Sequence, residues 1–186
     1  MNAEFRHVLP LDRVESEPMA VSLTPNEAER AAITERLTLR AVDALQADIR
    51  VWFLPGRRTL ALEGEITADV TQSCVVSLEP VREQLVDLFA EIQGAPLGEA
   101  EAMAVFPDHP DFDADAAADP EPLEGDEIDL GEIVIQYLSL ALDPYPRADG
   151  QAPAEGLEGV EFNGPERADE NAPFKKLGML WGLKAK

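Results

Sequence analysis

Hydrophobic and polar residues alternate along much of the first half of the chain, a pattern typical of β-strands. Residues 3–9 and 19–23 show it over short stretches. Between residues 37 and 78 it runs much further and is interrupted by Pro55-Gly56-Arg57-Arg58. Because a Pro-Gly pair between two apolar runs indicates a turn, we expect three or four antiparallel strands with hairpin connections in this region.

Two segments carry the start signals and the apolar spacing of helices. Thr24-Pro25-Asn26-Glu27 has the form of a capping box with Thr24 as the N-cap residue, and it predicts a helix that runs to about Leu37. Asp129 can cap a second helix over 130–142, whose apolar residues form one broad stripe. The chain is therefore expected to have an α+β fold, with a bent antiparallel sheet and two packed helices.

The segment 81–92 fits two descriptions. Its apolar residues recur at helical spacing, at Val81, Leu85, Leu88, Phe89 and Ile92. The alternation expected of a strand, through Val86, Leu88 and Ala90, is less regular. The pattern of residues alone favours a helix.

Acidic residues dominate the charge of the chain and gather in two stretches. The 186 residues include 37 acidic and 15 basic ones, for a net charge of −22. Residues 99–129 hold 12 Asp or Glu and no Lys or Arg, and residues 149–172 hold seven acidic residues against Arg167. Such a chain is a poor ligand for nucleic-acid phosphates and a better one for a basic protein. The same charge could equally serve solubility alone.

This charge distribution suggests the domain organisation. We expect one α+β domain over 1–148, with a mobile acidic loop at 99–127 that contributes little to stability, because its composition buries little apolar surface. An acidic linker at 149–172 and a basic, apolar tail at 173–186 follow. The chain has neither an apolar run long enough for a membrane span nor an evident secretory signal, so a cytoplasmic protein is expected.

Candidate catalytic groups are sparse. His7 and His109 lie far apart in the sequence, and Cys74 is the only cysteine, which excludes an intrachain disulfide and is too few ligands for a zinc site. Carboxylates in a mobile loop do not suit hydrolysis, which needs rigidly held acids. No phosphate-binding glycine motif is present. We expect no catalytic residue, no metal, no cofactor and no small-molecule substrate.

Three sets of residues are candidates for binding a partner. Two prolines flank Tyr145 and can present it together with Arg147. In the tail, apolar residues at helical spacing combine with lysines, at Phe174, Lys175, Lys176, Leu177 and Trp181; the tail either binds a partner or covers its own domain. A basic patch that could contact RNA phosphates consists of Arg36, Arg40, Arg50, Arg57 and Arg58.

Several of these segments, taken in order, are familiar. "TQSCVVSLEPV" around Cys74 is followed by the acidic loop, by "DEIDLGEIVIQYLSLALDPYPR" and by "NAPFKKLGMLWGLK". The chain resembles the YceD family of large ribosomal RNA subunit accumulation proteins over nearly its whole length, and its alphaproteobacterial members most. Many members carry a Cys-x-x-Cys and a second cysteine pair that suggest a metal site. Here Ser77 stands at the second of these positions, so the resemblance implies no zinc.

The resemblance implies a non-enzymatic role in the assembly of the large ribosomal subunit or the accumulation of its RNA. The implied partner is a basic ribosomal protein or the pre-ribosomal RNA of that subunit. It also implies that 81–92 is a strand, against the residue pattern. Two alternatives stay open: a metal-dependent RNA-processing enzyme, and an RNA-binding module that uses the patch from Arg36 to Arg58.

Overall fold

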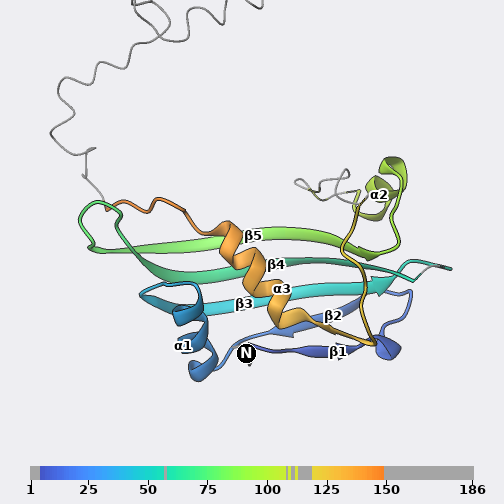
Figure 1. The fold of residues 1–186 in the computed structure, drawn as a ribbon, viewed down its shortest axis with the longest axis horizontal. Helices are drawn as coiled ribbons and strands as arrows, with labels where there is room; N and C mark the ends of the chain where they lie inside the picture. The colour runs from blue at the N-terminus through green and yellow to red at the C-terminus, as the bar shows by residue number, and fades with distance from the viewer. Residues whose placement is uncertain (1–4, 57, 108, 110–111, 113–118, 149–186) are drawn as a thin grey trace, which may run out of the picture. The chain divides into compact units, whose positions relative to one another are not determined.

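A four-stranded antiparallel sheet, in the order β2-β3-β4-β5, forms the centre of the fold (Figure 1). The structure is a computed structural model, and it describes residues 5–56, 58–107, 109, 112 and 119–148. The strands of this main sheet are β2 (Met19–Leu23), β3 (Ala41–Phe53), β4 (Thr59–Ser73) and β5 (Pro80–Gly94). The α+β fold expected from the sequence is confirmed.

The alternating region between residues 37 and 78 forms fewer and longer strands than the sequence predicted. Instead of three or four strands it makes β3 and β4, which pair from Phe53↔Leu60 to Ala41↔Thr71 with one shift of register between Val42 and Ala44. The Pro-Gly turn is where the sequence placed it. The Leu54 N–H donates to the Thr59 carbonyl at 2.9 Å, and Gly56 adopts a φ of +71° that only glycine accepts easily.

The ambiguous segment 81–92 is a strand, as the family resemblance implied, and not the helix that its spacing favoured. Leu85 and Phe89 are four residues apart and therefore face the same side of β5, where both are buried. Ile92 faces the opposite side and is buried there by a second cluster. Burial on both faces within one strand produces the apolar spacing that imitates a helix.

The N-cap residue of the first long helix, α1 (Glu27–Arg36), lies two residues after the predicted one. Asn26, and not Thr24, is the N-cap residue. Its side chain accepts the N–H groups of Ala28 and Glu29, and the Glu29 carboxylate accepts the Asn26 N–H at 2.7 Å. Two capping boxes overlap in the sequence, Thr24 to Glu27 and Asn26 to Glu29, and the helix uses the second, so the prediction of Thr24 was wrong. Leu37 ends the helix, as predicted.

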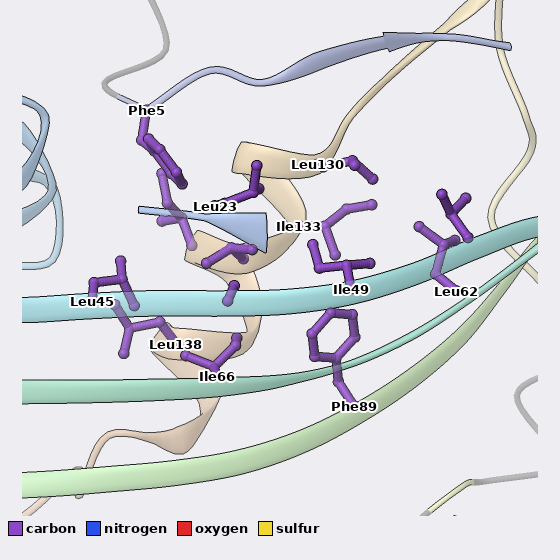
Figure 2. Close-up of a cluster of buried hydrophobic side chains, with 14 of the residues drawn as sticks. Phe5, Leu23, Leu45, Ile49, Leu62, Ile66, Phe89, Leu130, Ile133 and Leu138 are labelled. Carbon is purple, nitrogen blue, oxygen red and sulfur yellow. The ribbon is translucent and has the colours of Figure 1, made fainter. Parts of the chain in front are cut away.

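The second long helix, α3 (Leu130–Ala141), lies across one face of the main sheet (Figure 1) and closes the core. The Asp129 carboxylate accepts the N–H of Gly131 at 3.1 Å, so the predicted cap is confirmed. Figure 2 shows Phe89, Ile66 and Leu138 pointing into the space between the sheet and α3. The Phe89 ring stacks on Tyr137 of α3 with centroids 4.5 Å apart.

Residues from the two ends of the domain meet beside the start of α3. Strand β1 (Val8–Pro10), followed by the short 3-10 helix η1 (Leu11–Arg13), pairs with β6 (Glu127–Asp129) rather than with the main sheet. Gly131 is required here, because a Cβ atom at this position would lie 2.4 Å from the Phe5 carbonyl oxygen. The Leu-Gly pair that begins α3 therefore lets the backbone near Phe5 approach the helix.

The acidic segment holds an element that the sequence analysis did not predict. Helix α2 (Glu99–Val105) packs over one end of the sheet, on the face opposite α3. It forms a second apolar cluster in which Phe106 is 2% exposed and meets Trp52 edge to face, with centroids 5.7 Å apart. Part of the expected loop therefore buries apolar surface.

Candidate interaction surfaces

The arginines proposed for RNA contact lie on separate elements and make contacts within the domain. Arg36 of α1 pairs with Glu132 of α3 through two hydrogen bonds of 2.5 and 2.7 Å, which lower the pKa of the Glu132 carboxyl below its usual value. Arg40 donates to the Ser73 hydroxyl at 2.8 Å and to the Leu78 carbonyl. Both guanidinium groups hold parts of the domain together.

Two further members of this set, Arg50 and Arg58, lie on the hairpin of β3 and β4. Arg50 forms an ion pair with Glu63 on the neighbouring strand. Arg58 donates to the Gly125 carbonyl at 2.7 Å and lies 3.8 Å from the Asp126 carboxylate. Arg57 lies outside the described residues. Among the described arginines, the structure does not assemble the continuous basic patch that the sequence suggested.

Tyr145 and Arg147 follow α3 and are both exposed, Tyr145 to 71%. The segment that carries them is held by the Pro146 carbonyl, which accepts the Val75 N–H at 2.9 Å. Both side chains are therefore accessible to solvent. The tail candidates lie outside the described residues: Phe174, Lys175, Lys176, Leu177 and Trp181.

Carboxylates gather on the face of the main sheet that α3 leaves uncovered, which we call the open face. Asp48 of β3 and Glu65 of β4 lie directly opposite each other, although two like charges in this position disfavour strand pairing. Hydrogen bonds from Ser22 and Gln46 lower the pKa of Asp48, which keeps the group ionised. Together with neighbouring groups these carboxylates line a hollow of about 430 Å³, the acidic groove, which includes Ser22, Asp48, Arg50, Glu63, Glu65 and Leu88.

A second hollow, the edge pocket, lies beside the outer edge of β5 and has a volume of about 410 Å³. Its walls come from β5, α3 and the segment before β6, and include Leu88, Ala90, Glu91, Glu121, Tyr137 and Leu140. Burial raises the pKa of Glu91 above its usual value, a hydrogen bond from Gln93 partly offsets this, and the nearby Glu121 carboxylate raises it further. Burial and the Glu91 charge also raise the pKa of Tyr137. This electrostatic environment favours a cation.

Cys74 is fully buried in the turn between β4 and β5, and donors surround its sulfur. The backbone N–H groups of Val76 and Ser77 both lie 3.4 Å from Sγ. Hydrogen bonds from the Ser77 side chain, the Ser77 backbone and the Ala148 backbone lower the pKa of the thiol from 9.0 to about 6. Ser77, at the second position of the family's Cys-x-x-Cys, thus donates to the sulfur of Cys74.

The lowered pKa predicts that Cys74 makes stability depend on pH. A folded pKa below the unfolded one adds stability that is complete above pH 9 and is lost as the pH falls to about 6. We expect the melting temperature of the wild type to rise from pH 6 to pH 9 relative to that of Cys74→Ser, which keeps an acceptor but does not titrate there. Thermal melts at pH 6, 7.5 and 9 measure the difference. A constant difference would contradict a thiolate in the folded state.

The carboxylates of the open face were not predicted, because most of the negative charge of the sequence lies in the acidic loops and not in the strands. Their signal was present, since Glu63, Glu65 and Asp69 are two and four residues apart on one strand, and residues an even number apart share a face. The edge pocket had no comparable signal. It is built from segments that come together only in the fold, among them Glu91 and Tyr137.

The fold and these surfaces define an α+β protein with an acidic face and an acidic pocket at one sheet edge. Across the described residues, no three His, Cys, Asp or Glu side chains gather closely enough to hold a metal ion. None of the described helices is long and apolar enough to cross a membrane.

Residues 62–181 match the family model described as large ribosomal RNA subunit accumulation protein YceD, and the chain belongs to this family. The family expected from the sequence is thereby confirmed. Searches of curated proteins and of solved structures found no match. The family's description links its members to the accumulation of the large ribosomal RNA subunit.

Proposed function

We propose that this chain is a non-enzymatic factor in the assembly of the large ribosomal subunit, and that it acts by binding a basic ribosomal protein. The family description supports the link to that subunit. The observation that carries the choice of a protein partner is the acidic groove on the open face, where Asp48, Glu63 and Glu65 outnumber Arg50, the one basic residue of its lining with a full charge. Such a surface attracts a basic protein and repels nucleic-acid phosphates.

The alternative partner is pre-ribosomal RNA, bound through the arginines between Arg36 and Arg58. The structure gives this alternative less support, because Arg50 is paired with Glu63 and Arg58 contacts the segment before β6. A chain of net charge −22 would also have to overcome repulsion from the phosphates. We therefore propose the basic protein as the first contact, made before that protein reaches its RNA.

Removal of negative charge from the open face distinguishes a protein partner from an RNA partner. It should weaken the binding of a basic protein and should not weaken the binding of RNA. In Asp48→Asn/Glu65→Gln, affinity for isolated basic proteins of the large subunit should fall about tenfold at low salt, while affinity for large-subunit RNA fragments should stay or rise. The matched control is Glu17→Gln/Glu35→Gln, which removes the same charge from exposed positions elsewhere. Binding to RNA fragments alone, unaffected by both double variants, would refute the proposal.

We further propose that Tyr145, Arg147 and the tail at 173–186 make a second contact with the same assembling particle. Tyr145 and Arg147 point outward where the described residues end. The tail that follows carries Lys175 and Lys176 next to Phe174 and Leu177, a combination suited to a surface with both acidic and apolar parts.

Truncation of residues 173–186 tests the tail. We expect the shortened chain to keep its free energy of unfolding and to lose its association with large-subunit precursor particles, measured by co-sedimentation. If the tail covers its own domain instead, removing Phe174, Leu177 and Trp181 costs several kcal/mol, because burial of each such side chain is worth roughly 1.5–3 kcal/mol. A destabilised domain that still binds the particles would contradict the second contact.

A further inference from the structure

Among the described residues, no other strand pairs with the outer edge of β5 over most of its length. Strand β5 is the last strand of the main sheet, and within the described residues its outer side pairs only at Gln93, with Glu121 (Figure 1). The strand is 15 residues long, whereas exposed sheet edges are usually short or protected. From residue 80 to residue 92 the edge therefore presents a long row of backbone groups.

The structure shows which backbone groups point outward. The N–H of Gly94 donates to the Glu121 carbonyl, which lies outside the sheet, at 2.8 Å. In an antiparallel pair, alternate residues bond to the neighbouring strand and the residues between them point away. The register of β4 with β5 contains no shift, so Arg82, Gln84, Val86, Leu88 and Ala90 point their N–H and C=O groups outward like Gly94.

The side chains beside this edge are unusually apolar for an exposed strand. Val86 is 68% exposed and Leu88 is 42% exposed, and both lie on the open face. Leu88 also lines both the acidic groove and the edge pocket, so the two hollows meet at the edge of β5. A chain that ran along this edge would place its side chains in the hollows on either side.

The charge beside the edge of β5 indicates which kind of segment would bind there. In the acidic groove Glu63 is paired with Arg50, and Glu65 contributes a negative charge; the edge pocket contributes Glu91, Asp119 and Glu121. A basic side chain on either side of an added strand would therefore meet a carboxylate, whereas an acidic strand would be repelled.

We propose that the edge of β5 from Arg82 to Ala90 binds an extended, basic segment of a partner protein, which adds to the main sheet as a fifth strand. Backbone hydrogen bonds supply affinity in this mode of recognition, and side chains at alternate positions supply specificity. The inference rests on the proposed function, which provides a basic protein as the partner. It adds where that protein binds and in which conformation.

Hydrogen exchange of the full chain tests the edge, with a blocked peptide of alternating Lys and Val as the probe. The peptide has about nine residues, which matches the stretch from 82 to 90. In the unbound protein, the amides of Gln84, Val86 and Leu88 should exchange fast, and those of Leu85 and Phe89 slowly. The peptide should slow the first group at least tenfold, and an alternating Glu/Val peptide should leave it unchanged.

Val86→Pro blocks the edge without removing a bond between β4 and β5, because the lost N–H points outward and proline is tolerated there. Peptide affinity should fall at least tenfold, while Leu85 and Phe89 stay protected. If this variant does not fold, Val86→Lys places a repelling charge at the same site. Its matched control is Val76→Lys, at an apolar residue that is 44% exposed and lies in the turn before β5.

If something other than a basic partner segment covers the edge of β5, the exchange rates will show it, and the inference will be wrong. Slow exchange of Val86 and Leu88 in the unbound monomer would show that the chain covers its own edge, and protection that appears only at high protein concentration would indicate a second copy. Peptide binding without protection of these amides would place the peptide elsewhere.

Val86→Pro also tests the docking site independently of the proposed function. If Val86→Pro binds basic large-subunit proteins as tightly as the wild type does, the edge is not the site, and the proposed function stands. If the wild type binds no basic large-subunit protein but the Lys/Val peptide protects the edge, the proposed function fails, and the docking site stands.

Discussion

Replacement of Phe89 by alanine should lower the free energy of unfolding by about 3–5 kcal/mol, the usual loss for a phenylalanine removed from a core. Phe89 is 1% exposed and stacks on Tyr137, so its ring joins the edge strand to α3. A Cβ atom on Gly64 of the neighbouring strand would lie 2.8 Å from this ring, which shows how closely the ring is packed. Urea denaturation followed by circular dichroism measures the loss.

Val86→Ala is the matched control for Phe89→Ala, because it shortens an apolar side chain of the same strand that is 68% exposed. It should change the free energy of unfolding by no more than about 0.5 kcal/mol. Phe89→Leu should lie between the two variants, because it keeps most of the buried surface. A loss below about 1 kcal/mol for Phe89→Ala would mean that α3 does not depend on this ring.

Phe106→Ala should cost about 3 kcal/mol, near the lower end of the range for a buried phenylalanine, because α2 covers only one end of the open face. The sequence predicts that the acidic segment contributes little to stability, whereas the burial of Phe106 predicts a large contribution, and this variant decides between the two. Phe106 contacts both Trp52 and Phe112, with centroids 5.7 and 4.7 Å away. Its loss should therefore expose Trp52 to water.

The fluorescence of Trp52 measures this exposure directly, provided that the other tryptophan is removed. In a Trp181→Phe background, Phe106→Ala should shift the emission of Trp52 to longer wavelength. Met103→Ala is the control, since Met103 lies on α2 and is 50% exposed. Unchanged emission and unchanged stability in Phe106→Ala would support the original expectation for the segment.

The sequence predicted those elements whose signals lie within a few residues. The cap at Asp129, the turn at Pro55-Gly56 and the strand over 19–23 all depend on local chemistry, and the structure has them in place. The capping box of α1 failed because two boxes overlap, and local chemistry alone does not rank Thr24 against Asn26.

The features that the sequence did not predict depend on contacts between distant residues. Whether 81–92 is a strand is decided by what covers each of its faces, and the covering elements, α2 and α3, come later in the chain. The acidic groove likewise needs the register that places Asp48 opposite Glu65. Conversely, residues that are near in sequence need not lie together in the fold. Arg36 and Arg50 are an example, because they belong to different elements.

The pairing of β1 with β6 has a consequence for the order in which the protein folds. The His7 N–H donates to the Asp129 carboxylate, and these residues are 122 positions apart. Synthesis starts at the amino end, so residues 5–10 are made long before the elements that hold them. Because closing a longer loop costs more entropy, we expect the hairpins of β3, β4 and β5 to form first. The first strand to be made is then among the last to dock.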